Sequence, residues 1–118
     1  MSYSYSKDSR LKSSRQYQQV LERSKGARGK FITLHSFCNA NYPYTKLGVI
    51  ASKKYGKAIM RNRFKRIVRE AFRKVKSAFP VGTQIVVRPR KYAVEAKMHD
   101  ILDELLEFSK SLSEKNDH

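Results

Sequence analysis

Residues 52–76, SKKYGKAIMRNRFKRIVREAFRKVK, decide how this chain folds and what it can bind. Eleven of these 25 residues are Lys or Arg, and Glu70 is the one acid. Apolar residues recur at the spacing of one helical face and share an arc of about 140°: Met60, Phe64, Ile67, Val68, Ala71, Phe72 and Val75. The opposite side carries Asn62, Lys65, Arg66, Arg69, Arg73 and Lys76. The stretch therefore predicts a helix that buries one face and presents a row of cations on the other.

The charge of the whole chain points to a polyanionic partner. The 118 residues carry a formal net charge of +16, and the isoelectric point is about 10.2. Residues 1–92 hold 23 of the 26 basic residues and 3 of the 10 acids, which gives +20, whereas residues 93–118 hold 3 and 7, which gives −4. Nucleic acid is the commonest partner of so basic a protein. The length predicts a single domain over residues 11–113, with a flexible tail at 1–10 and a frayed end at 114–118.

Cys38 is the only cysteine, so the chain can form no intrachain disulfide bond and no cysteine-based zinc site. We expect Cys38 to be a small buried hydrophobic residue. No apolar run approaches the ~18 residues that a membrane span needs, and the first ten residues do not resemble a signal peptide. These features predict a cytoplasmic protein without a membrane partner.

Helix and strand signals alternate along the chain. Ser13 and Gln16 have the spacing of a capping box, so a short helix is expected from Ser13 to a stop near Gly26. The basic segment 25–30 is expected to be a loop. The sequence does not decide whether a third short strand also precedes the central helix. The segment 31–38 (FITLHSFC) predicts a strand, and 44–52 predicts the second arm of a hairpin with it.

The remaining elements complete an α+β sandwich of two layers. A further strand is expected at 83–88, and a last amphipathic helix begins near Ala93. Along the strand 31–38, Phe31, Thr33 and His35 would share one face, and Ile32 and Leu34 the other. Each helix has one apolar face, so each should pack on one side of the sheet.

Residues 61–66, RNRFKR, bring guanidinium groups, an ammonium group and an amide close together. Arginine matches the geometry of phosphate in pairs, and asparagine can bond to base edges or sugars. Lys53 and Lys54 stand at the junction before the helix, where backbone N–H groups can also bind phosphate. A solvated surface is the alternative for both groups. However, eleven bases against one acid repel one another unless a polyanion relieves them.

Catalytic groups are sparse in the sequence. His35, His99 and His118 show no spacing that pairs them as acid and base. Before residue 93 the acids are Asp8, Glu22 and Glu70, too widely separated for a two-metal nuclease. We therefore predict a polyanion-binding protein with neither catalytic nor metal-binding residues of its own.

Residues 48–73, GVIASKKYGKAIMRNRFKRIVREAFR, resemble the signature of the bacterial ribonuclease P protein subunit. The matching features are a strand ending in Ser-Lys-Lys, then Gly, Lys-Ala, Arg-Asn-Arg, Lys-Arg and Arg-Glu-x-Phe-Arg. The resemblance extends more weakly over about residues 10–112. It implies the order αβββαβα with a left-handed βαβ crossover, similar to domain 2 of ribosomal protein S5, where composition alone would suggest the usual right-handed connection.

The resemblance also implies a function. The protein would bind a large catalytic RNA and the 5′ leader of precursor tRNA, and the complex would remove that leader. The RNA subunit would hold the catalytic Mg²⁺ and make the cut, and the protein alone is expected to be monomeric. Contacts with the RNA subunit would come from Lys53, Lys54, Arg61, Asn62, Arg63, Lys65, Arg66 and Arg69.

The leader would lie in a cleft between the first helix and one face of the sheet. The resemblance carries this role to Tyr17, Leu21, Phe31 and Leu34. The residues by themselves leave open whether Tyr17 and Leu21 pack in the core or stack on bases, and which sheet face lines the cleft. Two rival functions also remain at this point: a structural ribosomal or other stable-RNA-binding protein on an S5-like fold, and a protein-only nuclease.

Overall fold

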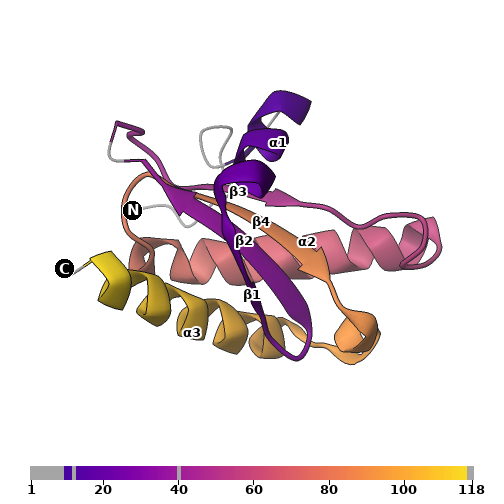
Figure 1. The fold of residues 1–118 in the computed structure, drawn as a ribbon. Coiled ribbons are helices and arrows are strands. Elements are labelled where there is room, and N and C mark those ends of the chain that lie inside the picture. Colours follow the sequence, from indigo (N-terminus) through magenta and orange to yellow (C-terminus); the bar gives the residue numbers. More distant parts are fainter. Residues whose placement is uncertain (1–9, 12, 40, 117–118) are drawn as a thin grey trace.

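The computed structural model describes residues 10–11, 13–39 and 41–116, and it is a mixed α+β fold (Figure 1). Three helices surround a four-stranded sheet with the strand order β1-β2-β4-β3. In chain order the elements are α1 (Ser14–Arg23), β1 (Lys25–Arg28), β2 (Ile32–Cys38), β3 (Lys46–Val49), α2 (Ala58–Val75), β4 (Thr83–Pro89) and α3 (Met98–Asn116). Two 3₁₀ helices, η2 (Lys76–Ala78) and η3 (Lys91–Glu95), follow α2 and β4.

The neighbours of β4 correct the expected hairpin. β2 pairs with β4 in the antiparallel sense, and β3 pairs with the other edge of β4 in the parallel sense. The segment 44–52 is therefore not a hairpin partner of β2. Residues 83–87 of β4 are all buried, which suits a central strand covered on both faces. The alternation of apolar residues in a strand does not specify its neighbour, so the sequence could not reveal this order.

β1 forms where a basic loop was expected. It pairs with β2 at the edge of the sheet, with Gly26 opposite His35. Strand pairing uses backbone groups, and exposed cations are common on edge strands. The polar sequence of β1 therefore lacks the apolar alternation from which a strand is predicted. Helix α1 accordingly ends at Arg23 rather than at Gly26.

The start of α1 confirms the predicted capping box. The Gln16 backbone N–H donates to the Ser13 hydroxyl at 3.2 Å, and the Ser13 N–H donates to the Gln16 side chain at 3.3 Å. These bonds satisfy donors that the first turn of a helix leaves without a partner. They fix the start of α1, which packs on the side of the sheet opposite to α2 and α3.

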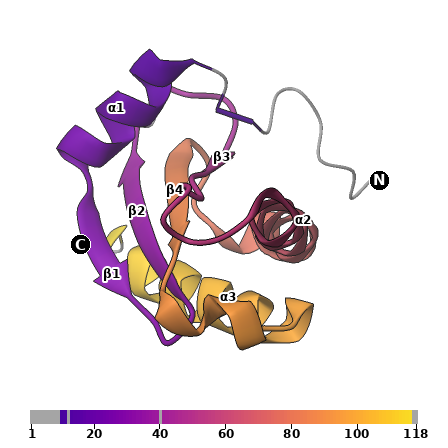
Figure 2. The same cartoon turned by 90° about the vertical axis from the view of Figure 1, so that its right-hand side faces the viewer.

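The main core lies between the sheet and the two long helices. Figure 2 shows α2 and α3 together on one side of the sheet, with α1 on the other. The largest fully buried side chains of the main core come from both layers, namely Ile32, Leu34, Leu47, Phe64, Phe72, Ile85, Ile101 and Leu105. A smaller cluster of Leu11, Val20 and Val86 lies under α1 and is joined by Tyr17, Leu21, Phe37 and Ile50. The two faces of the sheet are therefore covered to very different extents.

The last helix begins later and ends later than expected. Residues 91–95 form η3, so α3 starts at Met98 rather than near Ala93, and it continues to Asn116. The Glu104 carboxylate accepts hydrogen bonds from the backbone N–H groups of Phe31 at 2.9 Å and Ile32 at 3.2 Å. These bonds attach the start of β2 to α3. Residues 1–9 of the tail predicted at 1–10 lie outside the described residues, as do the last two residues. Arg10, the last residue of that predicted tail, forms an isolated parallel bridge with Leu47.

Candidate nucleic-acid interface

Helix α2 separates an apolar side from a cationic side as its sequence predicted. Phe64, Val68, Ala71, Phe72 and Val75 are buried. Met60 departs from the pattern, because it is 37% exposed at the first turn, beyond the edge of the core. The opposite side, here called the α2 cationic face, consists of Asn62, Lys65, Arg66, Arg69 and Arg73, all exposed or half-buried. One helix thus carries both the core contacts and a row of groups suited to phosphate.

Arg63 also has a structural contact. Its guanidinium donates a hydrogen bond of 3.0 Å to the backbone carbonyl of Ala96, between η3 and α3. The nearby Tyr55 ring packs against Phe64 with centroids 5.6 Å apart. Burial raises the pKa of Tyr55, and the Arg63 charge opposes that rise. Arg63 is exposed, as Asn62 and Arg66 are, but its hydrogen bond also ties α2 to the segment after β4.

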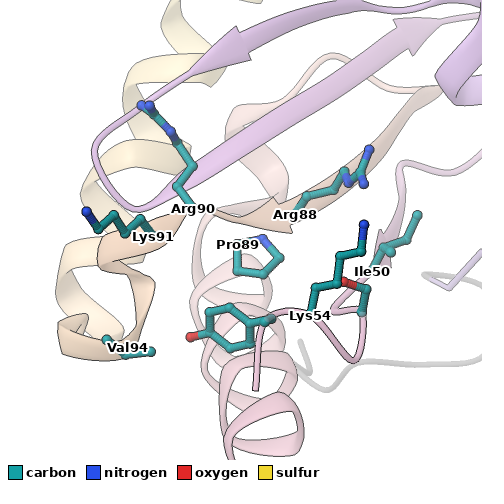
Figure 3. Close-up of a pocket in the computed structure, with 9 residues that line it drawn as sticks. Ile50, Lys54, Arg88, Pro89, Arg90, Lys91 and Val94 are labelled. Atoms are coloured by element: carbon teal, nitrogen blue, oxygen red, sulfur yellow. The ribbon is translucent and has the colours of Figure 1, made fainter. Parts of the chain in front are cut away.

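Lys54 lies beside a second group of cations that is distant in sequence. It lines an open pocket of about 400 Å³ together with Arg88, Arg90 and Lys91, and the described residues that line it include no carboxylate (Figure 3). The Arg90 guanidinium donates to the Gly29 carbonyl, which fixes it against the β1–β2 turn. Lys53 is exposed in the same turn but does not line this pocket. The fold thus joins the junction before α2 to the cationic end of β4.

The sheet face beneath α1 is only partly covered. We call it the open sheet face and define it by Thr33, His35, Phe37, Val86 and Arg88. Phe37 and Val86 pack with α1. Thr33, His35 and Arg88 instead line an open pocket to which no α1 residue contributes. This face therefore has an apolar end under α1 and a polar, cationic end beyond it.

Tyr17 and Leu21 lie on the side of α1 that meets the open sheet face. Both are half-buried and pack against the Leu11, Val20 and Val86 cluster. The Tyr17 ring also lies against Gly48 of β3, where an added Cβ would stand only 2.3 Å from the ring carbon Cε1. Gly48 therefore allows the close approach of this ring. The aromatic side chain packs on one side and keeps an exposed part beside the open sheet face.

Leu34 and Phe31 do not share this surface, which corrects the expected cleft. Leu34 is 1% exposed and belongs to the core under α2 and α3. Phe31 precedes β2 and packs against the same core, so it does not share a face with Thr33 as predicted. The four residues assigned to the leader are therefore divided between two faces of the sheet. A cleft beside α1 can include Tyr17 and Leu21 but not Leu34.

Three residues that the family assignment did not include, His35, Arg28 and Arg88, line the pocket at the polar end of the open sheet face. Burial, and then the charge of Arg88, lower the pKa of His35. Side chains alternate along β2, so the sequence already placed His35 on the face opposite to Leu34. This alternation could have suggested His35 as a residue of the open sheet face. Its proximity to Arg88 depends on the pairing of β2 with β4, which the sequence does not specify.

Cys38 is exposed rather than buried as expected. It lies on the same side of β2 as Ile32 and Leu34, but it is the last residue of the strand and does not belong to the main core. Over the part of the chain that the structure describes, no group of three or more His, Cys, Asp or Glu side chains is arranged to hold a metal ion. Within the same residues, no helix is both long and apolar enough to cross a membrane.

Comparison with known proteins identifies the family. The profile of the family described as Ribonuclease P matches residues 5–113. The ribonuclease P protein component of Chlamydia trachomatis serovar L2 is 43% identical over 84 residues, which are 71% of this chain and 69% of that protein. The corresponding protein of Thermotoga petrophila is 35% identical over 91 residues, 77% of each chain.

Solved structures give the same result. The ribonuclease P protein of Thermotoga maritima superposes with a TM-score of 0.76 at 32% identity, covering 86% of this chain and 96% of that one. A Staphylococcus aureus ribonuclease P protein mutant with defective mRNA degradation activity superposes with a TM-score of 0.77 at 27% identity, covering 88% and 90%. A family profile that spans most of the domain, relatives of this identity and a shared fold agree, so this chain belongs to the ribonuclease P protein family.

Proposed function

We propose that the two basic surfaces have different RNA partners. The α2 cationic face, with Arg61 beside it, contacts the ribonuclease P RNA, and the open sheet face with Tyr17 and Leu21 contacts the 5′ leader of precursor tRNA. The observation that carries this assignment is the separation of the surfaces, because α2 lies on one side of the sheet and α1 on the other. A protein that contacts two RNA molecules at once needs two such surfaces.

Electrostatics supports the first contact. The α2 cationic face includes Lys65, Arg66, Arg69 and Arg73, whose charges lie within one helix of 18 residues. Lys53 and Lys54 extend it towards the pocket at the end of β4. If six to eight phosphates are neutralised, log K should fall with log[salt] with a slope of about −5 to −7. Such a slope is the expected signature of assembly through this face.

The chemistry of leader removal is assigned to the RNA partner. In this proposal the RNA subunit holds the Mg²⁺ ions and cleaves the phosphodiester bond, and the protein raises the affinity for the substrate. The protein acts as a cytoplasmic monomer before it joins the RNA. We also infer that the parallel β3–α2–β4 connection is the left-handed crossover shared with domain 2 of ribosomal protein S5.

Reconstitution tests the proposal directly. Purified protein is combined with transcribed ribonuclease P RNA, precursor tRNA and Mg²⁺, and release of the leader is followed against RNA alone. The protein should lower the substrate and Mg²⁺ concentrations needed for cleavage. If the rate with protein equals that of the RNA alone at limiting substrate, the chain is a stable-RNA-binding protein of another kind.

A further arm of the same experiment tests whether the protein cleaves RNA by itself. One similar solved structure is of a Staphylococcus aureus mutant with defective mRNA degradation activity. The protein without RNA is therefore incubated with an unrelated mRNA and with precursor tRNA. Cleavage of either substrate would assign a nuclease activity to the protein itself, and intact substrates would leave the cut with the RNA partner.

A further inference from the structure

His35 stands at the cationic end of the open sheet face, in a pocket of about 470 Å³ between β1, β2 and β4. Arg28 and Arg88 line the same pocket from the two neighbouring strands, and no carboxylate is among its lining residues in the described part of the chain. Two guanidinium groups around one imidazole form a set of donors suited to a phosphate. The pocket is open, so a polymer can cross it.

The strand register explains how the imidazole comes to lie there. Gly26 is the β1 residue opposite His35. A Cβ at Gly26 would lie 3.3 Å from the imidazole Cε1, tighter than ordinary contact, so the glycine leaves room for the ring. On β4, Val86 stands opposite His35 and Arg88 opposite Thr33. Arg88 is thus the diagonal neighbour of His35 on the same face, at a spacing of about 7–8 Å between Cα atoms.

The charged groups around His35 favour its neutral form in the free protein. Burial is the larger cause that lowers the pKa of His35, and the Arg88 charge adds to it. Arg28 supplies a second cation from β1. On α1, Arg23 is exposed, and the Glu22 carboxylate accepts a hydrogen bond from Gln18 on the exposed side of the helix. A proton on His35 therefore has little to stabilise it until an anion arrives.

We propose that this pocket is a phosphate subsite for single-stranded RNA, in which His35 takes up a solvent proton and binds a backbone phosphate as the imidazolium, between Arg28 and Arg88. A phosphate there offsets the Arg88 charge and attracts the imidazolium, so binding raises the pKa of His35. By linkage, affinity must then increase as the pH falls through the range between the free and bound pKa values. Arg88 also lines the pocket that holds Lys54, so the subsite continues the cationic surface along one strand. This inference rests on the proposed contact between the open sheet face and single-stranded leader.

The test uses a short oligouridine, because uracil does not titrate between about pH 5.5 and about pH 8. Its dissociation constant is measured over this range with the full-length protein, with His35→Gln and with the control His99→Gln, whose imidazole is exposed on α3. Affinity of the wild-type protein and of the control should rise by about three- to tenfold more than that of His35→Gln as the pH falls. The same pH dependence in all three proteins would overturn the proposal.

A second measurement uses only the wild-type protein, so it does not depend on whether the His35→Gln variant folds. The imidazole resonances of the wild-type protein are titrated with and without saturating oligouridine, and the pKa of His35 should rise on binding. An unchanged pKa would contradict the subsite. With an oligouridine that has uncharged methylphosphonate linkages, the pKa of His35 should not rise. If the pKa still rises with this oligouridine, a phosphate is not the partner of His35. These readouts need no catalytic RNA, so their failure is distinct from a failure of the reconstitution.

Discussion

The two faces of the sheet differ in what they are built to do. The face under α2 and α3 is closed by long apolar side chains, and its central residues Leu34, Phe72, Ile85 and Ile101 are almost inaccessible to solvent. The other face has a small cluster under α1 and then an open, polar end with His35 and Arg88. One side of the strands therefore supplies the main core, and the opposite side carries the surface proposed to contact single-stranded RNA. Adjacent residues of β2, such as Leu34 and His35, therefore have different roles.

Leu34→Ala should show the largest effect, and on stability alone. Removing a fully buried leucine side chain leaves a cavity, so the free energy of unfolding should fall by about 2–5 kcal/mol. Chemical denaturation measures the loss, with Val81→Ala at a 70% exposed site as the matched control. The fraction that remains folded should discriminate leader-bearing from mature tRNA as the wild type does. A selective loss of leader binding would return Leu34 to the cleft.

Glu104→Ala should weaken the closed face from its edge. The substitution removes the acceptor of the Phe31 and Ile32 N–H groups, and unsatisfied donors in a partly buried site should cost about 1–3 kcal/mol of unfolding free energy. Thermal or chemical unfolding provides the measurement. Glu107→Ala, at an exposed site on the same helix, serves as the control. Equal stability of the two variants would show that the bonds from α3 to β2 contribute nothing.

Tyr17→Ala tests the open side. If a leader base stacks on the exposed part of the ring, the variant should bind leader-bearing precursor more weakly by about 1–3 kcal/mol, with a smaller change for mature tRNA. Binding of both RNAs to the reconstituted complex provides the measurement. Tyr17→Phe keeps the ring and should behave as the wild type. An equal loss for precursor and mature tRNA would limit Tyr17 to packing against Gly48.

Arg66→Gln and Arg63→Gln compare two arginines of one helix and carry the smallest expected effects. Arg66 is exposed, so its loss should reduce the salt slope of RNA assembly by about 1 and leave stability nearly unchanged. Arg63→Gln removes the hydrogen bond to Ala96 and should also lower the free energy of unfolding by about 1 kcal/mol. Salt titrations and denaturation of both variants decide the point. Identical profiles would remove the structural role of Arg63.

Much of the closed face could be predicted from local patterns. The spacing of Phe64, Val68 and Phe72 specified the buried side of α2, and the Ser13–Gln16 pair specified the start of α1. Both signals depend on residues within a few positions of each other, because helix geometry relates near neighbours directly. Strand signals were weaker, since the exposed edge strand β1 carries no apolar repeat.

The open sheet face could not be assembled in the same way. Its residues meet through the β1–β2 and β2–β4 registers, and Tyr17 reaches the sheet through a glycine in β3. Assigning Phe31 and Leu34 by their place in the family resemblance put two core-packing residues in the cleft. Alternation would put Phe31 and Leu34 on opposite faces, but Phe31 precedes β2 and also packs against the main core, so the period of two could not predict where both lie.

The basic character of the protein, the amphipathic helix at 58–75 and the family resemblance can be recognised in the amino-acid sequence, because composition and helical periodicity are local properties. The folded chain was needed to show that β4 lies between β2 and β3, that Arg63 is tied to Ala96, and that His35 rather than Leu34 faces the open side. These features arise from contacts between segments that are distant along the chain. Strand pairing and packing select those contacts, and no local pattern encodes them.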